Sequence, residues 1–461
     1  MAGFRSGAVA SIARKWLCAQ SPSRAPASRH SGVSHRKPAG PDNDASPLCV
    51  LSAGALCRSL LTSAVSSTPV LLTAAISFLS YLCRPGRPFL LDVRRNLALA
   101  WLMKQAVYKQ FCAGETLAET RATMSRMRAM GFRGTIITLA TETVCDHHGN
   151  RVNGPGLESG AETGAVMYPA IESWRKRTLE AVQMLSEGDQ LAVKMTGAGP
   201  LVTDALAAGK ALPVPMLDAL DEIGAQCKAQ QAQMLIDAES QLFQFGIFGV
   251  GLELMQKYNG DGHAVIYNTY QAYLKSMPAS LAEHLAAALD GGFILGLKLV
   301  RGAYLATEKR SLIHDTKQDT DDAYNAVALG ALQQCLLGFG GTDTGARPFP
   351  SVKLLLASHN KESVLAAHEL HTRRLGQGLK TVPVGFAQLQ GMSDTLSFGL
   401  LRLSGAPEVY KCSTWGSLDE CLGYLARRAA ENRDAADRTR DEYSALKAEA
   451  WRRLRRVFAT R

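Results

Sequence analysis

Eight short apolar runs, separated by longer stretches with helical periodicity, dominate the sequence between residues 130 and 415. The runs are continuously hydrophobic rather than alternating, which is typical of parallel strands buried on both faces. Most intervals between them are wide enough for a crossover helix. Eight such units predict an α/β protein built as a (β/α)8 TIM-type barrel. The runs are Gly134–Ala140, Gln190–Thr196, Gln233–Asp237, Ala264–Thr269, Phe293–Arg301, Val352–Ser358, Thr381–Gln388 and Glu408–Cys412.

A doubly wound dinucleotide-binding fold is the main alternative to the barrel. No Gly-x-Gly-x-x-Gly follows the first run and no phosphate-binding Gly-x-x-x-x-Gly-Lys-Ser/Thr occurs, so this fold is disfavoured. The polar, Gly-rich stretch Asp146–Glu162 predicts an insertion after the first run. Gly338–Arg347 predicts a surface connection, because its Gly, Thr and Asp residues supply turns and no strand or helix follows to form a phosphate cradle.

The positive charge is confined to one end of the chain. Residues 1–109 hold 14 Lys/Arg and three acids, so residues 110–461 hold 37 basic and 38 acidic groups. A nearly neutral body lacks the basic stripe that nucleic-acid binding needs, so we exclude that function class. Residues 1–41 carry seven Lys/Arg, no acid and many Ser and Ala, which predicts a mitochondrial presequence. The alternative is a disordered basic tail without a targeting role.

Two apolar segments outside the barrel raise the question of membrane contact. Ser59–Cys83 contains no charge over 25 residues, and we leave three interpretations open: a transmembrane helix, an interfacial segment, or ordinary helical packing. The C-terminal stretch Tyr443–Arg461 is amphipathic and basic, and packing on the body is favoured over membrane-surface contact. The predicted organisation is a presequence at 1–41, an apolar and helical segment at 42–129, the barrel domain at 130–440 and a C-terminal helix at 441–461.

Ten cysteines are scattered along the chain without any Cys-x-x-Cys, and no His-Glu-x-x-His occurs. Neither a zinc site nor an iron–sulfur site therefore has ligands at workable spacing, and the sequence predicts no metal. Unpaired cysteines suit a reducing compartment, and the mitochondrial matrix is one.

Polar residues lie at the carboxyl ends of the predicted strands, where the active sites of such barrels are found. Each residue alone has an ordinary structural explanation: a paired or snorkelling lysine, a core histidine, or a helix-capping aspartate. Their joint placement predicts a site, because every polar group in an apolar strand carries a desolvation cost. In strand order they are Lys194, Asp237, Gln271, Lys298 with Arg301, His359 with Asn360, Gln388 and Cys412.

A helix is predicted after the last strand, with Leu418, Leu422 and Leu425 on one stripe. It carries the adjacent pair Arg427 and Arg428. Both can reach one ligand only if the helix lies over the barrel mouth, because neighbouring residues point about 100° apart. The structural alternative is a solvated basic face; the functional interpretation is bidentate capture of a carboxylate.

Five segments in this order and at this spacing resemble the proline dehydrogenase (proline oxidase) family, most closely its mitochondrial, fungal-type members. Gln110–Glu115 is also similar. The match covers roughly residues 110–440 and is specific only as a combination. The segments are Asp237–Glu239 (DAE), Tyr267–Lys275 (YNTYQAYLK), Lys298–Tyr304 (KLVRGAY), Ser358–Asn360 (SHN) and Tyr424–Asn432 (YLARRAAEN).

The resemblance implies an enzyme that holds FAD non-covalently, oxidises L-proline to 1-pyrroline-5-carboxylate and passes electrons to quinone at the matrix side of the inner mitochondrial membrane. It implies a substrate site of Lys194, Arg427 and Arg428, with Tyr304 and Leu389 as pocket walls and Asp237 beside them. It also implies a group of flavin-binding residues, which are Gln271, Lys298, Val300, Gly302, Ala303, Ser358, His359 and Asn360.

One residue departs from the family pattern. Position 412 is commonly a tyrosine in proline dehydrogenases, and this chain has Cys412. A smaller side chain leaves room where hydroxyproline carries its hydroxyl, so hydroxyproline is an alternative substrate. Two further interpretations stay open: a Schiff-base enzyme that uses Lys194 or Lys298, and a catalytically silent flavin- or proline-binding homologue.

Overall fold

The computed structural model describes residues 46–461 except 85, 141–167, 342–344, 434–435 and 460–461. Residues 46–461 form one compact unit. The presequence expected at 1–41 and the insertion expected at Asp146–Glu162 lie outside the described residues.

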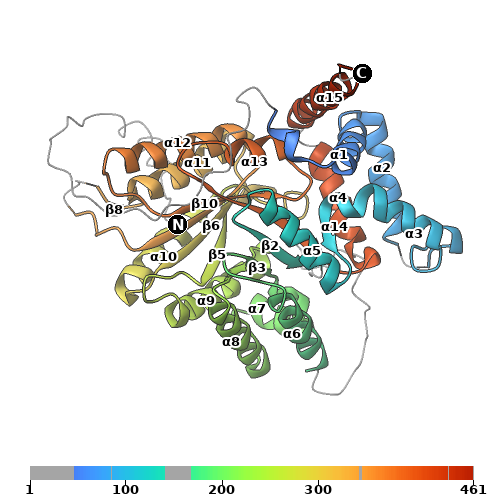
Figure 1. Cartoon of the computed structure of the whole chain (residues 1–461). Helices are drawn as coiled ribbons and strands as arrows, with labels where there is room; N and C mark the ends of the chain where they lie inside the picture. The colour runs from blue at the N-terminus through green and yellow to red at the C-terminus, as the bar shows by residue number, and fades with distance from the viewer. Residues whose placement is uncertain (1–45, 85, 141–167, 342–344, 434–435, 460–461) are drawn as a thin grey trace. The chain divides into compact units, whose positions relative to one another are not determined.

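Eight parallel strands close into a barrel at the centre of the unit (Figure 1). Each pairs in parallel with its neighbours, and β11 pairs with β2 to close the ring, with Cys412 opposite Ile136. The strands are β2 (Gly134–Leu139), β3 (Gln190–Val193), β4 (Gln233–Ile236), β5 (Ile266–Gln271), β6 (Leu295–Val300), β9 (Val352–Ala357), β10 (Val384–Leu389) and β11 (Glu408–Trp415). The predicted (β/α)8 fold is confirmed, and every predicted run overlaps one of these strands.

Helices surround the strands, as the crossover connections of a parallel barrel require. A buried apolar cluster fills the space between strands and helices, and a second, smaller one fills the barrel interior with Ile136, Leu235, Tyr267, Leu355 and Tyr410 among its members. The helices between the first and last barrel strands are α6 (Pro169–Val182), α7 (Pro200–Ala207), α8 (Val214–Ala229), α9 (Gln241–Tyr258), α10 (Met277–Gly291), α11 (Lys317–Gln333), α12 (Lys361–Gly376) and α13 (Asp394–Leu400).

The segment before the barrel packs against the helices that follow it (Figure 1). Helix α1 lies against α15, and α2 lies against α14. A third buried cluster joins Leu79 and Leu82 of α2 to Leu422 and Leu425 of α14. The helices are α1 (Ala53–Ser66), α2 (Pro69–Leu82), α3 (Leu97–Met103), α4 (Lys109–Phe111), α5 (Leu117–Ala129), α14 (Leu418–Arg433) and α15 (Ala436–Ala459).

Three details differ from the sequence interpretation. A short strand β1 (Cys112–Gly114) extends the sheet beside Thr414 and Trp415 of β11, which itself runs three residues beyond the predicted end. The loop 338–347 contributes a strand, β8 (Phe339–Gly340), which pairs with β7 (Cys335–Leu336). Three residues are too few to show a hydrophobic period, so β1 leaves no sequence signal.

The apolar stretch 59–83 is not a single continuous helix. Pro69 begins α2, and α1 and α2 meet at an angle of 102°. Within the described part of the chain no single helix is long and apolar enough to cross a bilayer. The bent pair α1 and α2 together would be, judged by length and composition alone. Leu72, Leu79 and Leu82 on one side of α2 are buried, which agrees with the packing interpretation for that side.

Candidate functional site

The carboxyl ends of β3, β4 and β6 bring two lysines to one aspartate. Asp237 follows β4 directly, and its two carboxylate oxygens accept hydrogen bonds from Lys194 Nζ at 2.8 Å and from Lys298 Nζ at 2.6 Å. Burial alone would raise the pKa of Asp237, but the two ammonium groups outweigh it and lower the pKa to about 2. The three side chains therefore form one ion-paired group, Lys194–Asp237–Lys298, at the barrel mouth.

Cys412 of β11 lies beside this group. It is aligned with Leu389 of β10, and its side chain packs against the apolar cluster inside the barrel. Burial raises the pKa of the Cys412 thiol, while Lys298, Lys194 and Arg428 act in the opposite direction. A protonated thiol is a poor nucleophile, so this shift disfavours a reactive-thiol role for Cys412.

The predicted arginine helix is α14, and it begins three residues after β11 ends. Arg428 is buried, and its guanidinium carbon lies 4.9 Å from the centre of the Tyr424 ring, a cation–π contact that holds it in place. Arg427 is half-buried and is close enough to Cys83, at the end of α2, to influence its pKa. The structure thus places Arg428 near Cys412, and it places Arg427 near α2.

Arg301, one of the predicted strand-end residues, has an extended polar network at this mouth, although the family resemblance gave it no role. Its guanidinium donates to Asp321 Oδ1 at 2.6 Å, to Ser363 Oγ at 2.8 Å and to Ser358 Oγ. The same group lies 4.2 Å from the centre of the Tyr324 ring. An arginine that ends an otherwise apolar run was the available signal. The network connects β6 with α11 and with Ser358, which follows β9.

Gln271 ends β5 and contacts the turn after β6, which contains Gly302 and Ala303. Gln271 is buried and aligned with Val300, and its Oε1 accepts a hydrogen bond from Ala303 N at 3.3 Å. Gly302 has φ +144°, and a Cβ at this position would collide with the ring of Tyr273. Only glycine suits this backbone, which explains the Gly in the Arg-Gly-Ala-Tyr segment.

The segment after β9 is fixed by side-chain hydrogen bonds. Asn360 is the N-cap of α12, where its Oδ1 accepts from Ser363 N at 3.0 Å, so capping accounts for part of its role. His359 Nδ1 lies 3.1 Å from Ser393 Oγ. Gln388 is buried and donates to Ser358 O at 3.2 Å. These residues form the mouth on the side of β9 and β10, opposite β3 and β4 in the order of the strands.

The two expected pocket walls lie at strand ends on the same mouth. Tyr304 is half-buried in the turn after β6, and its carbonyl accepts from Thr307 N and Glu308 N at 3.0 Å each. Leu389 is the last residue of β10 and packs against the cluster shared by α2 and α14. The structure brings both to the mouth; their roles as walls stay predictions.

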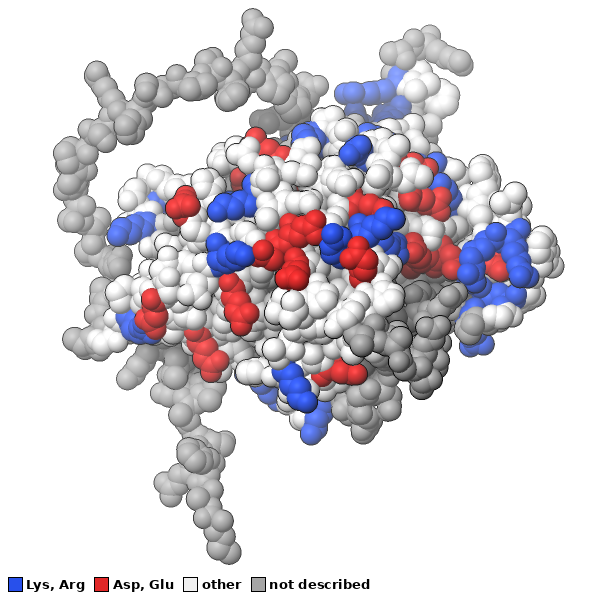
Figure 2. All heavy atoms as spheres, turned by 90° about the horizontal axis from the view of Figure 1, so that it is seen from below, with Lys and Arg blue, Asp and Glu red and all other residues white. Residues whose placement is uncertain are grey.

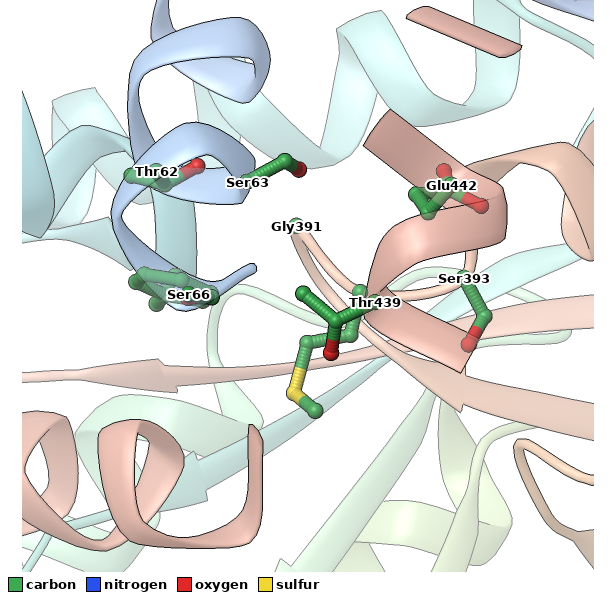
Figure 3. A pocket seen from close by; sticks show the side chains of 9 residues that line it. Thr62, Ser63, Ser66, Gly391, Ser393, Thr439 and Glu442 are labelled. Atoms are coloured by element: carbon green, nitrogen blue, oxygen red, sulfur yellow. The ribbon is translucent and has the colours of Figure 1, made fainter. Parts of the chain in front are cut away.

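A small cavity lies beside the mouth, between α1, α15 and the turn after β10. Its volume is about 30 Å³, and Figure 3 shows hydroxyl groups of Thr62, Ser63, Ser393 and Thr439 around it, together with the carboxylate of Glu442. Burial and the nearby Asp394 raise the pKa of Glu442. The volume holds about two water molecules, so this cavity is too small for a substrate.

The proline dehydrogenase family model matches residues 122–441 of the chain. This span contains the barrel and every site residue predicted from the sequence. The chain belongs to the proline dehydrogenase family. It is therefore an oxidoreductase of the proline dehydrogenase class.

Named relatives of this proline dehydrogenase family member fall into two groups. The probable mitochondrial proline dehydrogenase of Schizosaccharomyces pombe is 35% identical over 244 residues, which cover 51% of this chain and 49% of the relative. The human hydroxyproline dehydrogenase is 30% identical over 438 residues, covering 87% of this chain and 91% of the relative. This chain thus matches about half of the yeast protein and nearly all of the human protein.

Solved structures agree with the barrel fold. The proline utilization A protein of Bdellovibrio bacteriovorus, inactivated by N-propargylglycine, superposes with a TM-score of 0.61 at 18% identity. The similarity covers 85% of this chain and 39% of that one. At this identity the comparison supports the fold alone.

Replacing Gly302 by alanine tests the expectation that this turn holds FAD. The new Cβ meets the Tyr273 ring, so the backbone must move and Ala303 N loses its position next to Gln271. A strained φ costs about 1–3 kcal/mol, so the Kd for FAD should rise by about 5- to 150-fold if this turn holds the cofactor, measured by titrating FAD into stripped protein.

Gly249→Ala is the matched control for this substitution. Gly249 lies in α9, and a Cβ there meets no atom within 4 Å. We expect unchanged FAD affinity in this variant. Equal affinity of the Gly302→Ala protein and the control would contradict a cofactor-binding role for the turn.

Proposed function

We propose that the chain oxidises L-proline to 1-pyrroline-5-carboxylate at the C-terminal mouth of the barrel, with FAD as its cofactor. The observation that carries this proposal is the convergence of a buried arginine, Arg428, with the Lys194–Asp237–Lys298 group around Cys412. A small amino acid with one carboxylate and one basic nitrogen suits such a site, since cationic groups and a carboxylate both face it.

In this proposal Arg428, Arg427 and Lys194 bind the substrate carboxylate. A guanidinium offers two parallel N–H donors to a carboxylate, and burial strengthens the pairing. Asp237 orients Lys194 and Lys298, because each ammonium group donates to a different oxygen of its carboxylate. Tyr304 and Leu389 close the sides of the pocket.

The residues at the mouth suit FAD. Its pyrophosphate is anionic, and the mouth presents Lys298 and Arg301 together with the N-terminus of α12 at Asn360. The backbone at Gly302 is free of the Cβ that would force it to move. We propose that the cofactor is held by Gln271, Lys298, Val300, Gly302, Ala303, Ser358, His359 and Asn360.

When bound, FAD supplies the acceptor for the hydride that leaves the proline ring carbon. The protein contributes position and charge. Binding of the carboxylate by Arg428 fixes the ring, which converts reaction between separate molecules into reaction within one complex. The cationic side chains near the substrate nitrogen disfavour its ammonium form by like-charge repulsion, and oxidation requires the loss of that proton.

A second substrate, trans-4-hydroxy-L-proline, is favoured by Cys412. The thiol lies among Lys298, Asp237, Lys194 and Arg428, so it lines the space that a substrate ring would occupy. A cysteine fills less of this space than the tyrosine common in the family. The relatives that match this chain over 87% of its length include hydroxyproline dehydrogenases of rat, mouse, cattle and human.

Cys412→Tyr is expected to shift the preference of the enzyme toward L-proline. The larger ring would occupy the space available to the substrate hydroxyl, so we expect the ratio of kcat/KM for hydroxyproline to that for proline to fall by about tenfold or more. Both substrates are compared in a steady-state assay with a soluble dye as electron acceptor. Cys227→Ser, a buried cysteine of α8, serves as a control. An unchanged ratio in Cys412→Tyr would show that Cys412 does not determine the choice between the two substrates.

The structure gives little support to the Schiff-base alternative. That mechanism needs a lysine with a free, neutral amine, and Lys194 and Lys298 both donate to Asp237. The dye-reduction assay also tests the silent-homologue alternative. Dye reduction that depends on added proline or hydroxyproline and on FAD supports the proposed activity, and its absence with both substrates contradicts it.

We further propose a mitochondrial location, at the matrix side of the inner membrane, and quinone as the electron acceptor. Several relatives are named mitochondrial proline dehydrogenases, among them those of Schizosaccharomyces pombe, Drosophila melanogaster and Arabidopsis thaliana. Residues 1–41 have the composition of a presequence. A quinone resides in the bilayer, so this proposal requires contact between the protein and a membrane surface.

A further inference from the structure

Helices α2 and α3 and the turn between them expose a run of large apolar side chains. The inner side of α2 packs on α14 through Leu79 and Leu82. One side of α3 packs on the same cluster through Met103, Leu99 and Ala100, whereas the outer sides of α2 and α3 expose large apolar side chains. Leu97 is 80% exposed and Trp101, one helical turn later, is 64% exposed. The complete set, called here the α2–α3 surface, is Val70, Leu71, Phe78, Tyr81, Phe89, Leu90, Leu97, Trp101 and Leu102.

Basic residues outnumber acidic ones around the α2–α3 surface, where Asp419 pairs with Arg87 and Arg94, and Glu115 and Glu119 pair with Lys104. Residues 46–114 contain seven Lys/Arg and one acid. That acid, Asp92, is buried and lies within 3.8 Å of Arg87, Arg94 and Arg95. Arg94 and Arg95 are exposed. Figure 2 shows Lys and Arg side chains gathered at the edge where Figure 1 draws α3.

We infer that the α2–α3 surface lies on an anionic lipid bilayer. This inference rests on the proposed function for its purpose, delivery of electrons to a quinone. Apolar side chains would enter the acyl region, while Trp101 and the arginines lie at the headgroup level, where amphipathic rings and guanidinium groups are favoured. Anionic phospholipids complement the surplus positive charge.

The charge distribution favours lipid over a second copy of this chain as the occupant. In an isologous contact the exposed Arg94 and Arg95 would face their own copies across the two-fold axis. Asp92 and Asp419 offset this charge only in part, because both also pair with Arg87. A bilayer also accounts for Trp101 next to several leucines. The position of the surface is suitable as well, because α2 packs directly on α14, the helix that carries Arg427 and Arg428.

The first test is sedimentation of the full chain with phosphatidylcholine vesicles, with or without an anionic phospholipid. A triple variant, Leu90→Ser/Leu97→Ser/Trp101→Ser, is expected to lower vesicle affinity by about tenfold or more, since three exposed apolar side chains are lost. The matched control, Val214→Ser/Phe245→Ser/Leu375→Ser, removes equally exposed side chains from the outside of the barrel and is expected to bind as the unmodified chain does. Equal binding of the two triple variants would overturn the inference.

A second variant separates charge from apolar contact. Arg84→Gln/Arg95→Gln is expected to lose most of the preference for anionic vesicles and most of the dependence on salt. Light scattering measures the oligomeric state of all variants. A loss of dimers in the Leu90→Ser/Leu97→Ser/Trp101→Ser protein, without a change in vesicle binding, would assign the surface to a second copy instead.

Tryptophan quenching, measured in a Trp16→Phe background that removes the tryptophan of residues 1–45, locates the contact. Brominated phospholipids quench tryptophans that enter the bilayer, and we expect the quenched part of the emission to disappear in Trp101→Phe. Quenching that persists in Trp101→Phe and disappears in Trp451→Phe would place the contact on α15 and overturn the inference. Dye reduction with proline is expected to be the same in every surface variant, so failure of the membrane inference and failure of the proposed activity are distinguishable.

Discussion

Arg428→Ala is expected to lower kcat/KM for L-proline by about 100- to 1000-fold, equivalent to about 3–4 kcal/mol. Arg428 is buried beside Cys412 and is the arginine that the geometry brings to the proposed substrate site. Its loss would leave the substrate carboxylate buried without its main partner. We expect most of the effect in KM, because the carboxylate is bound in the ground state as well as in the transition state.

Two further variants show whether the shape or the charge of the Arg428 side chain determines proline binding, one as the test and one as the control. Arg428→Lys keeps the charge but loses the planar fork, so its activity should lie between those of Arg428→Ala and the unmodified enzyme. Arg455→Ala removes an exposed arginine of α15 and should leave kcat/KM unchanged. A KM for proline in Arg428→Ala within about twofold of the unmodified value would contradict the assignment of Arg428 as the carboxylate ligand.

Asp237→Asn is expected to destabilise the folded protein by about 3–5 kcal/mol, because it leaves two neighbouring ammonium groups at the mouth without their counter-ion. All three side chains are at least 84% buried, so solvent screens this repulsion only weakly. Urea unfolding followed by circular dichroism measures the change. Asp290→Asn is the control, since its partner Arg347 and Asp290 itself are both exposed, and we expect a change below about 1 kcal/mol.

The pH dependence of stability gives an independent check on Asp237. Its pKa is lowered in the folded protein to about 2, below the ordinary value of 3.8. The ionised carboxylate therefore contributes stability above about pH 4, and this contribution is lost as the pH falls toward about 2. The stability difference between the unmodified chain and Asp237→Asn should be largest near neutral pH and should shrink in acid. A difference that grows on acidification would contradict the ion-paired group.

The barrel could be predicted from the sequence because each strand is a continuous apolar run. Positions such as Lys194 and Lys298 could be found for the same reason, since a charge in such a run must have a partner. The partner could not be identified from the sequence. Asp237 lies 43 residues from Lys194 and 61 from Lys298, and closure of the barrel brings the three together. Arg301 could be found for the same reason. Its hydrogen-bond partners Asp321 and Ser363 could not be identified, because they belong to separate helices.

The structure of the segment before the barrel could be predicted only in part. The absence of charge from Ser59 to Cys83 allowed three interpretations, and periodicity could not choose among them, because α1 and α2 are separate helices at 102°. Pro69 was the available sign of the break. The orientation of Arg427 and Arg428 could likewise not be predicted from the sequence, since it depends on how α14 packs on α2 and β11.

The most direct test of the proposed function is an anaerobic absorbance titration of the purified full chain with bound FAD. L-proline is added first, and trans-4-hydroxy-L-proline is added to a second sample. We predict that the flavin band bleaches with proline in the unmodified chain, and with hydroxyproline as well if Cys412 widens the pocket. In Arg428→Ala the same bleaching should require far higher substrate concentrations. A folded, FAD-loaded chain whose flavin band neither compound bleaches would contradict the proposed function.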